Sequence, residues 1–301
     1  MKIRLLFWCC VLILFWSCSD DDSGTMHELT NWFEIQDNPN DELQHLAYLI
    51  YKDTGIPIFY NDTIGCEQRG VNADGTPYYY YEILDGRYTL SGTANLTYKI
   101  SPNRNKIKLG LELLRDQVIR RLPKRVRVNS FLLVDTIYLN DNRKKIELNV
   151  YRSMMTTLVG KIICIDKMTD QDKDIWAAEI LSTSVAAYMI NNTGNELDEF
   201  YAVIRSIPSG NEPPDPTFAN YGMFIYTMGE PEPSHEDFGC LSSVPTGSYG
   251  FTLPKREKDL NDYIMAYYSW KESDFLEKYK NYPKVLEKYQ WLRNYMDREF
   301  K

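Results

Sequence analysis

The sequence predicts a mixed α/β protein of the α+β class, with a mixed β-sheet, a central helix and a helical C-terminal part. Short segments with the residue pattern of strands dominate the first half of the chain. A long helical pattern follows at residues 174–189, and further helical patterns lie near the C-terminus. Hydrophobic residues make up 44% of the 301 residues and charged residues 25%, which is typical of a globular protein.

The N-terminus has the pattern of an export signal. Lys2 and Arg4 precede an apolar run at residues 5–16, which is too short to span a membrane but suits a signal peptide. Ser17 and Cys18 come next. This arrangement resembles the signal of bacterial lipoproteins. We therefore expect residues 1–17 to be a signal peptide, and Cys18 to carry lipid that anchors the chain in the outer membrane.

Three aspartates follow the lipid-bearing cysteine almost directly, at residues 20–22. This run resembles the signal that exports lipoproteins to the outer cell surface, which would leave the protein facing the cell exterior. A solvated tether is the alternative interpretation. Residues 18–40 are predicted to be an acidic tether, and residues 41–301 a single domain.

The charge and the cysteines exclude some classes of protein. Removal of the signal peptide takes the formal net charge from −8 to −10, because Lys2 and Arg4 leave with it. So acidic a chain is not expected to bind nucleic acid. Besides Cys18, the mature chain keeps Cys66, Cys164 and Cys240. This odd number, without Cys-x-x-Cys spacing, argues against a disulfide framework or a thiolate zinc site, although one pair could still form a disulfide.

The first half of the domain is expected to begin with a helix at 41–52, ended by Thr54 and Gly55. A β-rich insertion is predicted around residues 63–101, where Asn-Ala-Asp-Gly and Leu-Asp-Gly sequences signal turns. Its four consecutive tyrosines at 78–81 would place two rings on each face of a strand, either to contact a ligand or to pack an edge. A helix at 106–121 is also expected. Strands are predicted at 56–60, 128–139, 145–150 and 160–165.

In the second half, helices are predicted at 196–204, 257–268 and 283–300. Two segments rich in Pro, Gly and Ser, 207–216 and 229–254, are predicted to be long loops of the kind that often cover a site. A basic cluster at 120–127 has two interpretations. It either contacts an anionic partner such as lipopolysaccharide, or it forms a solvated helix end where cations suit the helix dipole.

The central helix carries the clearest functional pattern. Asp174 stands where an N-cap belongs, and a stop signal follows at 191–194. Zincin peptidases bind zinc through His-Glu-x-x-His, because residues at i and i+4 lie on one helix face. The corresponding residues here are Ala178-Glu179-Ile180-Leu181-Ser182. The glutamate is present, but neither Ala178 nor Ser182 can bind zinc.

These features resemble those of the zinc-binding metallopeptidase-like lipoproteins of Bacteroidetes. The likeness rests on the lipoprotein start, the sequence around Ala178-Glu179, an acidic helix and a C-terminal helix rich in Lys and Tyr. It extends to the segments 57–60, 131–134 and 258–263. The resemblance implies a zincin-like domain whose acidic helix would supply a carboxylate ligand, with Asp259 and Asp262 as the nearest counterparts. We interpret Ala178, Glu179, Ser182, Asp259 and Asp262 as vestigial positions.

The chain contains few histidines that could bind a metal. The chain has only His27, His45 and His235, and no two of them share a helix face. Catalytic zinc usually takes two or three His or Cys ligands. Without a metal, water keeps a pKa of about 15.7, so Glu179 has no competent proton to remove. The sequence therefore predicts no cofactor, no metal and no catalytic residue. A serine nucleophile at Ser182 or Ser184 and a Cys240–His235 pair both lack the usual context.

Three hypotheses remain. The first is a binding or scaffold protein that has lost zinc and catalysis and whose cleft takes a peptide, a protein or a glycan. The second is an active zinc metallopeptidase with atypical ligands, His235 with Asp259 or Asp262. The third is an accessory nutrient-binding lipoprotein that works with an outer-membrane transporter, suggested by the lipid anchor and the tyrosine-rich insertion.

Overall fold

The computed structural model describes residues 30–89, 92–141, 144–206, 221–226, 233–246 and 250–300. Residues 33–301 form one compact unit, and in the N-terminal unit, 1–32, only the last three residues are described. The predicted signal peptide, Cys18, His27 and the loop at 207–216 lie outside the described residues. Within the described part, no helix is both long and apolar enough to cross a membrane.

A six-stranded mixed sheet forms the first half of the unit, and strand β7 (Phe131–Asp141) is its centre. The first residues of β7 pair in parallel with β1 (Ile58–Phe59) and β10 (Thr157–Val159). Its later residues pair antiparallel with β6 (Leu96–Ile100) and β8 (Lys144–Leu148). Strand β9 (Val150–Arg152) lies antiparallel to β10. The predicted mixed sheet is therefore confirmed.

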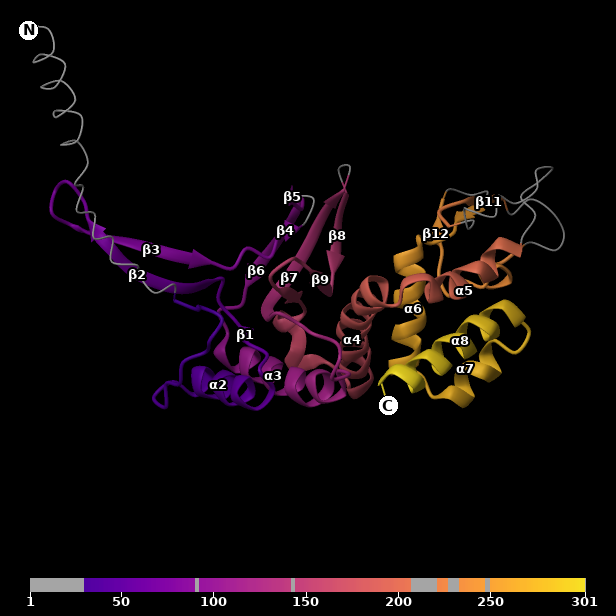
Figure 1. Ribbon diagram of the computed structural model, residues 1–301, viewed down its shortest axis with the longest axis horizontal. Helices are drawn as coiled ribbons and strands as arrows, with labels where there is room; N and C mark the ends of the chain where they lie inside the picture. Colours follow the sequence, from indigo (N-terminus) through magenta and orange to yellow (C-terminus); the bar gives the residue numbers. More distant parts are fainter. Residues whose placement is uncertain are drawn as a thin grey trace, which may run out of the picture. The chain divides into compact units, whose positions relative to one another are not determined.

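Two helices pack near this sheet (Figure 1). Helix α2 (Glu42–Thr54) begins where the Asp41 side chain accepts hydrogen bonds from two backbone N–H groups, and it ends at Gly55 in a left-handed conformation. Helix α3 (Arg104–Leu113) continues as one π-helical turn (Leu114–Val118) and then a 3₁₀ turn (Ile119–Arg121). The predicted single helix at 106–121 thus covers three successive helical geometries.

The strand predicted at 160–165 is wrong. Strand β10 ends at Val159, and a 3₁₀ helix, η3 (Ile162–Lys167), follows. Lys161 adopts a left-handed backbone, with φ 70°, which turns the chain out of the sheet. Ile162 and Ile165 then point into the core with a spacing of three, which suits a 3₁₀ turn and not a strand.

Helix α4 (Asp170–Asn192) is the central helix. Its first residue, Asp170, lies four residues before the predicted N-cap Asp174. The true cap is Thr169, whose side chain bonds the backbone of Asp172 while the Asp172 carboxylate bonds Thr169 in return. Its first half packs in the core with α2 and α3, and its second half packs with the C-terminal helices. The helix therefore joins the two halves of the unit.

The C-terminal part is helical, as predicted. It consists of α5 (Leu197–Ala202), α6 (Arg256–Ser269), α7 (Glu272–Lys278) and α8 (Pro283–Phe300), which share one hydrophobic core. Part of the long loop predicted at 229–254 is instead a 3₁₀ helix, η6 (His235–Phe238), and two short strands. Strand β13 (Gly250–Thr252) lies between β11 (Phe224–Tyr226) and β12 (Val244–Pro245).

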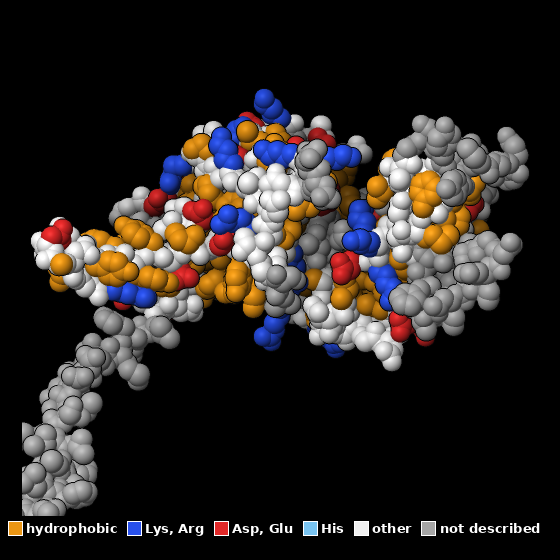
Figure 2. Space-filling view, turned by 90° about the horizontal axis from the view of Figure 1, so that it is seen from above, with side chains coloured by type: hydrophobic (Ala, Val, Ile, Leu, Met, Phe, Trp, Pro, Cys, Tyr) orange, Lys and Arg blue, Asp and Glu red, His pale blue; other side chains and the backbone are white. Residues whose placement is uncertain are grey.

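The predicted β-rich insertion contains a long hairpin of β2 (Thr63–Val71) and β3 (Pro77–Ile83), and a short pair of β4 (Tyr88–Thr89) and β5 (Gly92–Thr93). Strand β6, at its end, belongs to the main sheet. Figure 2 shows hydrophobic side chains exposed along the long hairpin. Tyr78, Tyr79 and Tyr81 are about half exposed, whereas the Tyr80 ring lies against the Arg69 guanidinium. Three of the four tyrosines therefore face solvent.

Candidate functional site

Ala178 and Ser182, at the two positions that would hold zinc in a zincin helix, are fully buried. The Ser182 Oγ donates a hydrogen bond of 2.9 Å to the backbone carbonyl of Glu179, within the same helix. Neither position presents a metal ligand to a cavity. Their small side chains belong to the packed interior of α4 instead, where close approach of neighbouring elements favours small residues.

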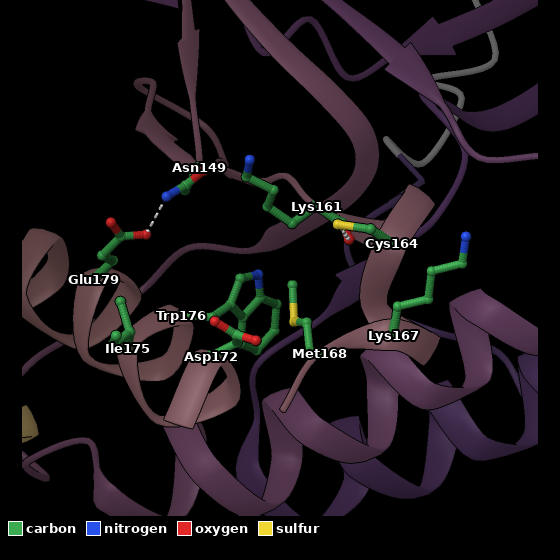
Figure 3. A pocket seen from close by; sticks show the side chains of 9 residues that line it. All are labelled: Asn149, Lys161, Cys164, Lys167, Met168, Asp172, Ile175, Trp176 and Glu179. Carbon is green, nitrogen blue, oxygen red and sulfur yellow. Dashed lines mark hydrogen bonds between the residues drawn. The ribbon is translucent and has the colours of Figure 1, made fainter. Parts of the chain in front are cut away.

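Glu179 lies between these positions but faces a surface cavity of about 270 Å³ (Figure 3). Its Oε2 accepts a hydrogen bond of 2.6 Å from the Asn149 Nδ2, which comes from the turn between β8 and β9. Partial burial raises the pKa of the Glu179 carboxyl, while the Asn149 hydrogen bond and the charge of Lys161 lower it in part. Ionisation of Glu179 in the folded chain therefore costs free energy, because the carboxylate is partly removed from water.

The wall of this cavity opposite Glu179 comes from η3 and the residues on either side of it. Lys161, Cys164, Lys167 and Met168 line it from that side, and α4 contributes Asp172, Ile175 and Trp176. The Trp176 Nε1 donates to the backbone carbonyl of Gly160 at 3.0 Å, and only 2% of this residue is exposed. The indole therefore fixes α4 against the end of β10, and the polar groups stand in front of it.

Lys161 is the only non-glycine residue in the described part of the chain with a positive φ. A left-handed backbone costs an L-residue about 1 kcal/mol, and glycine would fill the position without that cost. The Lys161 ammonium bonds Glu147 at 3.0 Å and contributes to the field at Glu179. A strained lysine whose side chain lines the cavity points to a role for that side chain.

Asp259, the first of the two candidate carboxylates on α6, has several partners in the core. It is fully buried and forms an ion pair with Lys288 of α8, and its Oδ2 accepts a hydrogen bond of 2.6 Å from the Tyr221 hydroxyl. The Lys288 ammonium also donates to the carbonyl of Gly239 at 2.9 Å. Burial raises the pKa of the Asp259 carboxyl, and Lys288 offsets part of this effect.

Rings surround this buried pair. The Lys288 Nζ lies 4.4 Å from the centre of the Phe200 ring and 4.7 Å from that of Tyr263. Cys240 is also buried beside Asp259, and burial together with that carboxylate raises the pKa of its thiol. The Cys240–His235 nucleophile pair is therefore disfavoured, because a thiol with a raised pKa carries little thiolate.

Asp262 and His235 lie in separate small networks. Asp262 pairs with Lys258 one turn earlier and accepts a 2.5 Å hydrogen bond from the Ser242 hydroxyl. The His235 Nε2 lies 3.4 Å from the Glu236 carboxylate. Within the described residues, no three His, Cys, Asp or Glu side chains gather closely enough to hold a metal ion. The residues present at the zincin positions do not fit zinc.

The three remaining cysteines are free thiols that differ in exposure: Cys66 is exposed, Cys164 half-buried and Cys240 buried. Cys164, within the apolar run 162–165, lines the cavity next to Lys161. Sequence reasoning also missed Asn149 and Lys161. For Lys161, the one local signal of a turn was the Gly160-Lys161 pair directly after an apolar run. No local pattern distinguished Asn149.

Comparisons with known proteins add no family to this description. No family model matches the chain, and neither a curated protein nor a solved structure matches it. The functional conclusion therefore depends on the residues and the geometry of the chain itself.

Proposed function

We propose that this chain is a surface-exposed, lipid-anchored protein of the outer membrane, with a zincin-like domain that has lost zinc and catalysis and binds a ligand instead. Lipid on Cys18 would hold it in the membrane. The retained glutamate of the zincin pattern, Glu179, would serve as a hydrogen-bond acceptor for the ligand. The cavity in front of it would be the binding site (Figure 3).

The observation that carries this proposal is that, within one turn of α4, Glu179 faces the cavity whereas the two positions of the missing zinc ligands are buried. Ala178 and Ser182 are fully buried, so this turn offers the cavity one carboxylate and no second zinc ligand beside it. The Glu179 carboxylate has an amide partner in Asn149 and a cation nearby in Lys161. Without a metal, such a carboxylate cannot activate water, but it can accept hydrogen bonds from a bound molecule.

A short peptide segment fits the cavity better than a glycan does. The cavity is lined by groups of both signs, Glu179 with Lys161 and Lys167, together with apolar surface from Met168 and Ile175. Peptides carry amide donors and acceptors and side chains of either charge. Glycans are usually held against an exposed aromatic face, and the one aromatic ring that lines this cavity, Trp176, is buried.

Cys164 provides a direct test, because its thiol lines the same cavity. In a mature protein with Cys66→Ser, a maleimide reagent should modify Cys164, while the buried Cys240 stays protected. Peptides selected on an array should slow this modification in the wild-type cavity and fail to do so with Glu179→Ala. Glu277→Ala, an exposed carboxylate change on α7, is the matched control. Equal protection of wild type and Glu179→Ala would overturn the proposal.

Metal analysis separates this function from an active peptidase. The purified mature protein should contain no stoichiometric zinc after dialysis, and no supplied metal should produce peptide cleavage. About one tightly bound zinc per chain, or cleavage that a chelator abolishes, would contradict the proposal and favour the atypical set of His235 with Asp259 or Asp262.

The exposed hairpin favours a second candidate, an accessory role in nutrient uptake. Tyr78, Tyr79 and Tyr81 present large rings to solvent, which suits contact with a partner protein or a glycan. Replacing these three tyrosines with serine should abolish co-purification with an outer-membrane transporter if the hairpin is the contact. Unchanged co-purification, or a blank glycan array together with no transporter, would count against this candidate.

A further inference from the structure

A second cavity, of about 260 Å³, lies beside the C-terminal half of α4 and shares no lining residue with the Glu179 cavity. Three arginines line it: Arg125, Arg127 and Arg152. The helix contributes the remaining wall, Ser184, Ala187, Tyr188, Asn191 and Asn192. All three guanidinium groups come from exposed residues, and no carboxylate lines the cavity.

The charges of these arginines are largely uncompensated. Arg125 bonds the Glu299 carboxylate at 2.7 Å. Among the ion pairs of the described residues, neither Arg127 nor Arg152 has a partner. The chain as a whole has 42 acidic and 34 basic residues, so carboxylates are not scarce. Like charges that face one cavity repel one another, and a bound anion would relieve this repulsion.

Contacts with the rest of the fold hold the backbone segment 125–130, which carries Arg125 and Arg127, in place. The buried Val126 anchors the segment between Arg125 and Arg127. Two residues later, the Asn129 Nδ2 donates to the carbonyl of Met154 at 3.0 Å, and the Ser130 Oγ donates to that of Met155 at 2.9 Å. These bonds tie the segment to the β9–β10 turn, next to Arg152.

A purely structural role for the arginines at this helix end is poorly supported. Cations often lie at helix C-termini because the last carbonyl groups lack partners. Here Asn191 donates its side-chain N–H to the carbonyl of Ala187 at 2.9 Å, and Asn192 does the same for Tyr188 at 2.8 Å. Ala187 and Tyr188 lie one turn before the helix end, so their carbonyls are not among the unpaired ones. Among the hydrogen bonds of the described residues, the only one from Arg125 goes to Glu299, and none joins Arg127 or Arg152 to a carbonyl of this helix end. The amide oxygens of both asparagines remain available as acceptors.

We propose that this cavity binds a saccharide that carries a tetrahedral oxyanion, a phosphate or sulfate ester. Guanidinium groups from two chain segments match several oxygens of such a group better than the single flat face of a carboxylate. The asparagine oxygens and the Tyr188 hydroxyl suit the hydroxyl groups of a sugar. Phosphate and sulfate esters share this chemistry, and the experiment separates them.

Calorimetry with the mature wild-type protein and three probes tests the proposal: glucose 6-phosphate, glucose 6-sulfate and glucose. At least one ester should bind, more weakly as salt is raised, while glucose itself should not. Arg127→Gln combined with Arg152→Gln should weaken ester binding by about tenfold or more, because two charge-assisted contacts are lost. Both side chains are exposed, so the fold should tolerate the changes, which urea unfolding verifies.

Lys99→Gln combined with Lys144→Gln is the matched control, since it removes the same charge from exposed residues that line neither cavity. It should leave ester binding unchanged. A preference for the phosphate or for the sulfate identifies the ester and supports the proposal either way. Binding of neither ester, equal binding of glucose, or equal losses in the two double variants would overturn it.

Discussion

Two carboxylates that the zincin resemblance picks out, Glu179 and Asp259, have opposite environments. Asp259 is fully buried between Lys288, Tyr221 and a set of aromatic rings. Glu179 faces a cavity and has one amide partner, Asn149. The difference shows that an acidic residue buried against a cation and a hydroxyl group supports the fold, whereas one that faces a cavity with few partners is placed for a ligand.

Breaking the buried pair should give the largest effect. Lys288→Met leaves the Asp259 carboxylate without its cation in the core of the C-terminal helices. Removal of one partner of a buried ion pair costs about 3–5 kcal/mol. We expect a loss of that size in the free energy of unfolding, measured by urea denaturation at neutral pH. The loss should shrink in acid, where Asp259 can take up a proton.

A triple variant sharpens this prediction. Lys288→Met, Asp259→Leu and Tyr221→Phe together replace the whole network by apolar groups, and the Gly239 carbonyl keeps its 3.0 Å hydrogen bond from the Tyr263 hydroxyl. Because well-packed apolar groups often equal a buried ion pair, most of the lost stability should return. If the triple variant were no more stable than Lys288→Met, the pair would hold the fold by more than charge neutralisation.

Restoring the missing zinc ligands should give the next largest effect. Ala178→His combined with Ser182→His recreates the His-Glu-x-x-His pattern, but both positions are fully buried. Overpacking a close-packed site costs about 1–3 kcal/mol per substitution, so the double variant should unfold at lower urea concentration and bind no zinc. Ile190→His, an exposed position on the same helix, should leave stability almost unchanged. Stoichiometric zinc in a stable double variant would reveal a usable metal site.

The sequence predicted elements well where local signals and packing agree. The C-terminal helix has the predicted bounds, Pro283–Phe300, because proline suits a first helical turn and an apolar stripe follows it. The N-cap of α4 was misplaced, although Thr169 and Asp172 form a readable capping box. The segment 160–165 was misread because a short apolar run is ambiguous between strand and 3₁₀ turn.

The partners of the two carboxylates could not be predicted in the same way. Asn149 is 30 residues from Glu179, and Lys288 is 29 residues from Asp259. Neither partner has a spacing that a helix or a hairpin would impose, so the pairing follows from the packing of α4 against the sheet and of α6 against α8. A motif on one helix identifies a position, while the chemistry of that position depends on which distant residues the fold brings to it.

Glu179→Gln should give the smallest effect on stability. A gain in stability would fit a carboxylate kept for a ligand, whereas a loss would fit a carboxylate that supports the fold. Burial raises the pKa of this carboxyl, so ionisation favours the unfolded chain. The corresponding stability is complete below the ordinary glutamate pKa and is lost as pH rises through the folded value. Glutamine keeps the acceptor for Asn149 but cannot ionise, so the variant should be more stable than wild type at neutral pH, by less than about 1 kcal/mol.

That advantage should shrink as the pH falls toward about 4, where wild-type Glu179 becomes neutral as well. Urea denaturation of both proteins across this range measures the difference. Peptide protection of Cys164 should weaken in the same variant at neutral pH, because glutamine lacks the charge that a cationic or amide donor would meet. A variant that lost stability at neutral pH would instead show that the ionised Glu179 carboxylate stabilises the fold, against the direction of its raised pKa.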